Sequence, residues 1–126
     1  MNAPDVAPLT RTLTQPMLNA YADASGDHNP IHIDEAFAKT TPMGGTIAHG
    51  MLVLSFISQM MTAAFAERWL GSGSLEVRFR APARPGDTLT ARATVQEPKN
   101  GRLRYAVECV SQTGEQLITG TAEVSA

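Results

Sequence analysis

Residues 27–32 read Asp27-His28-Asn29-Pro30-Ile31-His32, and the glycine-rich loop 41–50 then leads into an apolar segment that opens at Met51. Asp27 and His32 are two titratable side chains five positions apart, with a proline between them. The apolar segment carries hydrophobic side chains on nearly every face, so it predicts a helix that is buried on most sides. A polar pair next to a buried helix indicates a site that faces an apolar wall. The rest of the chain is typical of a sheet that supports this site.

The size and charge of the chain narrow the class of protein. Its 126 residues suit one domain that spans 1–126 and has its own core. A hydrophobic fraction of 43% and a charged fraction of 17% are typical of a globular protein. Because 10 basic and 12 acidic residues give a net charge of −2, the basic excess of a nucleic-acid-binding protein is missing.

Cysteine and hydropathy patterns indicate a cytoplasmic protein without a membrane partner. Cys109 is the single cysteine, which excludes an internal disulfide framework and a cysteine-based zinc site. Its neighbours are typical of a strand, so a buried and inert thiol is expected. The N-terminus lacks the basic and apolar regions of a signal peptide. The longest apolar run, Met51–Phe65, contains several polar residues and is too short to span a bilayer.

The first half of the chain predicts one short strand and three helices. Thr14 followed by Pro16 is typical of a helix start, and Gly26 of its end. Asp34 is expected to cap a second, short helix. The predicted ranges are a strand at 8–13 and helices from Thr14 to about Gly26, at 35–38 and from Met51 to Trp69.

The second half alternates apolar and polar residues, which predicts strands with one buried and one solvent-exposed face. Four such segments follow each other, and the pair Asn100-Gly101 predicts a tight hairpin. We therefore expect an α+β fold with a four-strand antiparallel meander over one long helix. A single curved sheet leaves open edges, and pairing two copies edge to edge would remove one pair of them. The predicted strands lie near residues 75–80, 89–95, 103–109 and 117–124.

The segment 27–32 supports two interpretations. Pro30 disfavours a helical conformation at Asn29 and removes one backbone donor, so regular helix is not expected here. In the structural interpretation, Asp27 and Asn29 bond nearby amides in a capping loop. In the functional interpretation, Asp27 and His32 form an acid–base pair that shares a water molecule.

A metal site is a weaker alternative. His28 and His32 are four residues apart and would share a face of a helix, but Pro30 lies between them. Because no cysteine is near and His49 is the only other histidine, we expect no metal.

The entry to the long helix, His49-Gly50, has properties of an anion site. Free amides at a helix N-terminus point toward whatever lies in front of them, and glycine allows a close approach. A carbonyl oxygen that gathers negative charge would be stabilised there. The alternative is that Gly44, Gly45 and Gly50 only permit tight turns and that His49 serves packing or capping.

The combination of Asp27, Asn29-Pro30 and His32 with the later His49-Gly50-Met51 resembles the MaoC-like dehydratases, or R-specific enoyl-CoA hydratases. The resemblance extends over most of the chain. It implies a hot-dog fold, in which an antiparallel sheet wraps round one long helix and two copies form a homodimer with a continuous sheet.

The resemblance also implies an activity, which is hydration of a trans-2-enoyl thioester to the R-3-hydroxyacyl product, and the reverse dehydration, without a cofactor. Asp27 and His32 match the catalytic residues of the family, and the backbone N–H of Gly50 matches the oxyanion donor. Asn29, Ser58 and His49 match or adjoin supporting positions. The substrate would be bound to CoA or to an acyl carrier protein.

Substrate contacts are expected from cations and from apolar side chains. Arg78, Arg80 and Arg84 are suited to phosphate, although a solvated strand face explains them as well. The acyl chain would contact apolar residues that include Phe56 and Met51, which could equally belong to the core. Acyl-CoA thioesterases of the same fold commonly carry an acid on the central helix. Because residues 51–66 contain no Asp or Glu, thioesterase activity is a less favoured alternative. A non-catalytic acyl-binding subunit is also less favoured, because such a relative would be expected to lose the Asp27 and His32 pair, and both residues are present.

Overall fold

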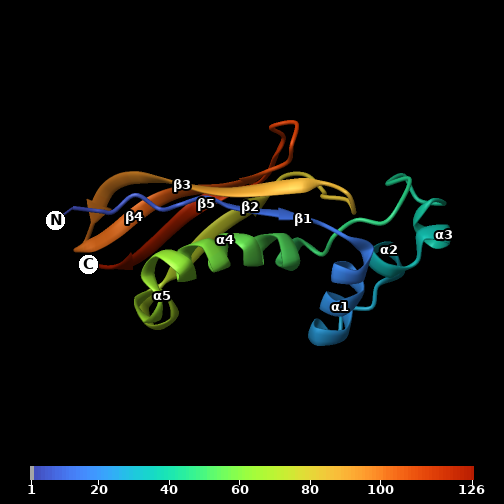
Figure 1. Cartoon of the computed structure of the whole chain (residues 1–126), viewed down its shortest axis with the longest axis horizontal. Coiled ribbons are helices and arrows are strands. Elements are labelled where there is room, and N and C mark those ends of the chain that lie inside the picture. The colour runs from blue at the N-terminus through green and yellow to red at the C-terminus, as the bar shows by residue number, and fades with distance from the viewer. Residues whose placement is uncertain (1) are drawn as a thin grey trace.

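The computed structural model describes residues 2–126 and has one five-stranded antiparallel sheet with a long helix, α4, along one face (Figure 1). The α+β prediction and the central helix are therefore confirmed. The strands are β1 (Leu9–Thr12), β2 (Ser74–Phe79), β3 (Thr88–Lys99), β4 (Arg102–Val110) and β5 (Gln116–Ser125). The helices are α1 (Gln15–Ser25), α2 (Pro30–Ile33), α3 (Glu35–Ala38), α4 (Gly50–Phe65) and α5 (Glu67–Ser72).

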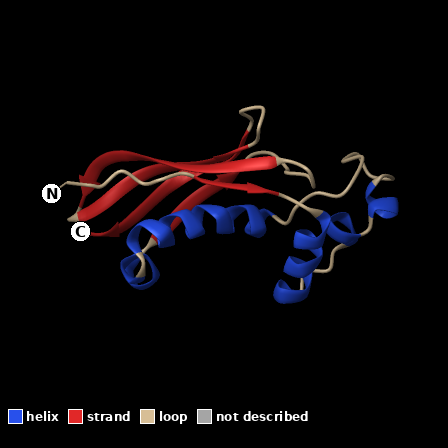
Figure 2. Ribbon diagram, viewed as in Figure 1, coloured by secondary structure: helices blue, strands red, loops and turns tan. Residues whose placement is uncertain are grey.

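The elements form two layers with an extension at one end. The sheet makes one layer and α4 runs beneath it, as Figure 2 shows. Helices α1, α2 and α3 lie beyond the end of the sheet at which α4 begins, whereas both chain termini lie at the opposite end. Segment 27–33 is thereby brought next to the first turn of α4. Within residues 2–126, none of the helices combines the length and the apolar character needed to cross a bilayer.

The core lies between α4 and the sheet. Burial of these apolar side chains, at about 25 cal/mol per Å², is the main force that holds the helix on the sheet. The buried residues of α4 are Leu52, Val53, Phe56, Ile57, Met60, Met61 and Phe65.

The other face of α4 differs from the prediction. Ser55, Ser58, Gln59 and Thr62 are half-buried or exposed and recur at helical spacing, so the helix has a polar face after all. The prediction failed because serine and threonine can lie on a buried or on an exposed face of a helix. Their hydroxyls can bond to the carbonyls of their own helix, as Thr62 does to the Ser58 carbonyl.

The predicted helix from Met51 to Trp69 is interrupted at Ala66. Ala66 has a φ of 49° and a ψ of −125°, a conformation that is rare for a residue with a side chain; it ends α4, and α5 then starts. The turn allows Trp69 to be buried and to donate its indole N–H to the Ser58 hydroxyl over 3.1 Å. The burial of Trp69 is a tertiary contact, so the local sequence does not predict the break at Ala66.

The predicted four-strand meander is wrong in one respect. The order across the sheet is β1-β3-β4-β5-β2, so β2 pairs with β5 and not with β3. The connection from Arg80 to Asp87 is longer than a tight hairpin and carries the chain across the sheet. Gly120 permits the new pairing, since a Cβ there would lie within 2.2 Å of the Glu76 carbonyl oxygen.

The predicted caps and the hairpin are confirmed. The Thr14 side chain accepts a bond from the Met17 amide, Gly26 ends α1 with a φ of 81°, and Asp34 caps α3. Asn100 and Gly101 have φ values of 52° and 74°, the conformation of a type I′ turn, between β3 and β4.

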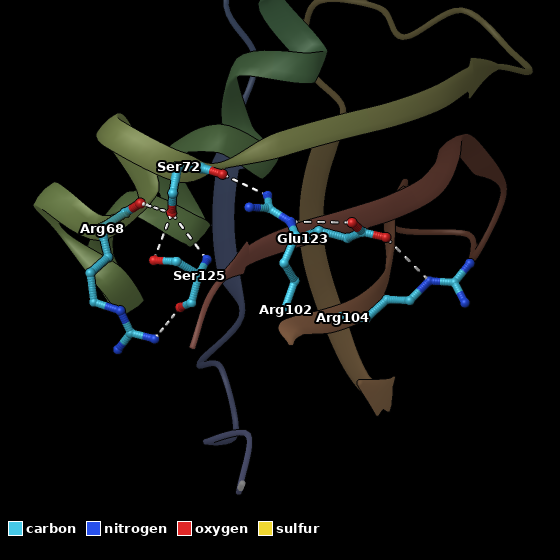
Figure 3. A network of polar contacts seen from close by, with 6 residues as sticks. All are labelled: Arg68, Ser72, Arg102, Arg104, Glu123 and Ser125. Atoms are coloured by element: carbon cyan, nitrogen blue, oxygen red, sulfur yellow. Dashed lines mark hydrogen bonds and ion pairs between the residues drawn. The ribbon is translucent and has the colours of Figure 1, made fainter. Parts of the chain in front are cut away.

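A polar network joins α5 to the end of β5 (Figure 3). The Ser72 hydroxyl accepts a bond from the Ser125 amide and donates to the Arg68 carbonyl. Arg102 donates to the Ser72 carbonyl over 2.6 Å and contacts Glu123, which also faces Arg104. These bonds fix the far end of the molecule, away from segment 27–33.

Candidate active site

Segment 27–33 begins as a loop and ends as one helical turn. Asn29 caps α2, because its side chain accepts a bond from the Ile31 amide over 3.1 Å. Pro30 is the first residue of that turn, a position where its missing N–H costs nothing. The prediction of no regular helix across 27–32 is therefore wrong for residues 30–32, which belong to α2, and correct for residues 27–29.

Asp27 uses its two carboxylate oxygens differently. Oδ1 accepts a bond from the Asn29 amide over 3.2 Å, as the capping interpretation predicts. Oδ2 lies 3.8 Å from Nε2 of His32, and the Asp27 side chain is 55% exposed. The capping and acid–base interpretations are thus compatible, since each needs one oxygen.

The ring of His32 is oriented by a backbone bond. Its Nδ1 lies 2.8 Å from the Ile47 carbonyl oxygen, which can only accept, so Nδ1 carries the hydrogen. In the neutral ring, Nε2 is then the atom with a free lone pair, and it faces Asp27. The side chain is only 12% exposed, so the ring has little freedom.

His49 supports this pair from the buried side. It is 2% exposed, and its Nε2 donates to the Asp27 carbonyl oxygen over 3.0 Å. Its ring stacks on His32 with centroids 3.8 Å apart and packs against Tyr21 at 4.8 Å. Among the described residues, Nδ1 of His49 has no hydrogen-bond partner.

A pocket of about 350 Å³ brings His32 and Gly50 together. Gly50 is the first residue of α4, and the capping residue His49 gives this helix no side-chain cap bond within the described residues. The helix start therefore keeps donors that the protein itself does not cap. The pocket is lined by His32, Ile47, Ala48, Gly50, Val53, Phe79, Arg80, Ala81, Pro82, Ala83, Leu117 and Ile118.

Asp27, His32 and His49 also form a group whose potential metal-binding atoms lie within 4.8 Å of one another. Ligands about 2.1 Å from a tetrahedral zinc ion lie roughly 3.5 Å apart, which is closer than this spacing. His49 already donates from Nε2 to the Asp27 carbonyl. The geometry therefore favours a hydrogen-bonded cluster over a preformed metal site.

The other candidate residues lie in different places. Arg80 lines the pocket, whereas Arg84 lies outside its lining and bonds through its backbone N–H to Asp87. Met51 is exposed and Phe56 belongs to the core. Ser58 accepts the bond from Trp69 and lines a separate groove beside β1. The functional roles of all five stay predictions.

Several residues of the site were missed. Gln15 donates to the His32 carbonyl, Ile47 accepts from its ring, and Phe79 forms one wall of the pocket. A ring carbon of Phe79 would lie 3.1 Å from a Cβ at Gly50, so the two residues are in close contact. These contacts join segments far apart in the chain, and no local pattern predicts them.

The fold, a sheet over one long helix, is that of the hot-dog proteins. The site, a carboxylate and an imidazole, lies next to the first turn of that helix. The MaoC like domain family matches residues 2–116, and the chain belongs to this family.

Similar proteins carry consistent names. An (R)-specific enoyl-CoA hydratase from Rhodospirillum rubrum is 36% identical over 124 residues, which cover 94% of this chain and 83% of the relative. The unliganded R-hydratase PhaJ1 from Pseudomonas aeruginosa superposes with a TM-score of 0.86 and 32% identity, over 100% of this chain and 82% of that one. The (R)-hydratase from Aeromonas caviae involved in PHA biosynthesis superposes with a TM-score of 0.85 and 29% identity, over 99% of this chain and 96% of that one.

Proposed function

We propose that the protein catalyses the reversible hydration of a trans-2-enoyl thioester to the R-3-hydroxyacyl thioester. The observation that supports this most is the free Nε2 of His32, which faces Asp27 Oδ2 at 3.8 Å. His32 lines a pocket together with Gly50 at the start of α4, and Asp27 lies just outside that lining. The names of the similar hydratases point to the same reaction.

Asp27 and His32 hold the water molecule. Both Oδ2 and Nε2 are acceptors, and a water about 2.8 Å from each fits their separation. Such a water donates one hydrogen to each group and presents its oxygen lone pairs to the β-carbon of the substrate. One group takes a proton as the oxygen attacks.

The charge moves from the β-carbon to the thioester oxygen as the new C–O bond forms. An amide donor at Gly50, assisted by the positive end of the α4 dipole, stabilises that oxygen. The proton held by the polar pair is then delivered to the α-carbon, so that one water has been added and the pair returns to its initial state. The thioester serves as the electron sink, and the reaction needs no cofactor.

The substrate enters the pocket with its carrier outside. Val53, Phe79, Leu117 and Ile118 provide an apolar surface for the acyl group. Arg80 is the arginine in the pocket lining and is suited to a phosphate of CoA or of an acyl carrier protein. Arg84, Met51 and Phe56 lie outside the lining, and their predicted substrate contacts require a longer substrate or a second subunit.

Three activities are separated by one experiment. Incubation with crotonyl-CoA, with a thiol reagent present, reports the enoyl absorbance and free CoA together. A hydratase lowers the absorbance without releasing CoA, a thioesterase releases CoA, and a non-catalytic binding subunit does neither. We expect the first result, and either of the others would refute the proposal.

The active unit is a homodimer with a continuous sheet. Strand β2 is an edge of the sheet with no partner on its outer side within residues 2–126, and it ends at Phe79, which is 56% exposed. Pairing two copies of β2 would satisfy its open backbone groups and cover this ring. Sedimentation velocity should give about twice the chain mass of 13.4 kDa. A monomer at micromolar concentration would contradict this arrangement.

A further inference from the structure

The main chain of His32 is held by a residue far away in the sequence. Gln15, the first residue of α1, donates from Nε2 to the His32 carbonyl oxygen over 2.8 Å. A carbonyl only accepts, so this bond fixes which end of the Gln15 amide points toward His32. The amide oxygen, Oε1, therefore faces the opposite side.

Thr46 holds that oxygen in place. Its hydroxyl lies 2.8 Å from Oε1 of Gln15 and 3.0 Å from Oε2 of Glu35, and the two acceptors share its single hydrogen. The Thr46 amide donates to the same Glu35 oxygen over 3.2 Å. Thr46 is 3% exposed, so water competes little for these bonds.

The next residue, Ile47, holds the imidazole itself. Its amide donates to the Ile31 carbonyl over 3.1 Å, and its carbonyl accepts from Nδ1 of His32. The backbone and the ring of His32 are thus fixed by Gln15 and by the segment 46–47. Thr46 connects these two supports, because its side chain bonds Gln15 and its main chain continues into Ile47.

We propose that Gln15 and Thr46 are positioning residues that hold His32 against the Ile47 carbonyl, and that they act on the orientation and tautomer of the ring through that bond. The proposal rests on the acid–base role given to His32 above. Neither residue lines the pocket that would receive the acyl group. Their loss should therefore affect the rate of the chemical step and leave substrate binding intact.

The test uses variants that remove one bond each. Thr46→Val keeps the shape of the side chain and removes the hydroxyl, whereas Thr46→Ser retains it. Gln15→Met removes the donor to His32, and Gln15→Glu removes it with less change in shape. Matched controls are Gln96→Met on β3 and Thr113→Val in the turn after β4, both exposed and neither part of the pocket lining.

With crotonyl-CoA, we expect kcat to fall roughly tenfold in Thr46→Val and in both Gln15 variants, with KM unchanged. Thr46→Ser and the controls should keep wild-type kcat. Thermal unfolding identifies any variant that fails to fold, and the remaining variants then decide the test. Wild-type kcat in folded Thr46→Val and Gln15→Glu, or a change confined to KM, would overturn the proposal.

A second measurement does not depend on activity. The ¹⁵N spectrum of the histidine rings should show His32 protonated at Nδ1 in the wild type and a mixture of tautomers in Gln15→Met. An unchanged spectrum would overturn the positioning role even if the wild type proves to be a hydratase. If the wild type fails to hydrate crotonyl-CoA, the proposed function fails, and the spectrum alone still tests whether Gln15 and Thr46 orient this ring.

Discussion

Asp27 and His32 each use one polar atom of the side chain in a hydrogen bond to the backbone. The second polar atom of each side chain stays available for the reaction. Oδ1 of Asp27 and Nδ1 of His32 are both bonded to backbone groups, whereas Oδ2 and Nε2 face each other. Each ring or carboxylate is therefore held in orientation before substrate arrives. Such preorganisation lowers the cost of reaching the reactive geometry.

The neighbouring histidine, His28, is expected to have a pKa above its ordinary value. The Asp23 carboxylate bonds Nε2 of His28 at 3.0 Å, which raises the pKa of His28 above its ordinary value. In an NMR titration, Asp23→Asn should lower this pKa. The stabilising effect of the pair is full below the unfolded pKa of about 6.5 and is lost as pH rises through the raised folded value. An unchanged pKa in Asp23→Asn would show that the pair does not form in solution.

Cys109 should be inert in the folded protein. The side chain is fully buried in β4, and burial raises the pKa of the thiol to about 11. At pH 8, roughly one molecule in a thousand would carry the thiolate, which is the reactive form. A disulfide reagent should therefore label Cys109 only after unfolding by denaturant. Rapid labelling of the native protein would contradict this.

Helices and strands show where local sequence is informative and where it is not. The caps at Thr14, Gly26 and Asp34 and the turn at Asn100-Gly101 depend on one residue and its near neighbours, so they could be predicted. The break at Ala66 depends on the burial of Trp69. The position of β2 beside β5 depends on the bare backbone of Gly120. Neither of these causes is visible in a local pattern.

The junction of α5 with β5 should be sensitive to one hydroxyl. Ser72→Ala removes the acceptor for the Ser125 amide and the bond to the Arg68 carbonyl (Figure 3). We expect the free energy of unfolding to fall by about 1–2 kcal/mol, because partly buried groups lose their partners. Ser74→Ala, at an exposed position two residues later, is the control. Equal stability of both variants in urea unfolding would refute a structural role for the network.

For the whole molecule, the fold positions the site at one end of the sheet, where α1, α2 and α3 lie beyond the end at which α4 begins. The meeting of Asp27 and His32 could be predicted, because both belong to one short segment. The pocket could not, since Phe79, Leu117 and Ile118 come from strands that reach it only through the sheet topology. That residues 1–126 form a single domain, and that two copies pair, stay predictions.

The Asp27–His32 pair is tested most directly by kcat for crotonyl-CoA hydration in Asp27→Asn and His32→Gln, with Asp23→Asn as the matched control. We expect each of the first two changes to lower kcat by roughly 10²-fold or more without loss of the folded state, and the control to keep wild-type kcat. Formation of the R-3-hydroxy product by the wild type, followed by chiral chromatography, verifies the reaction. Near-normal turnover in either folded variant would contradict the assignment of these two residues.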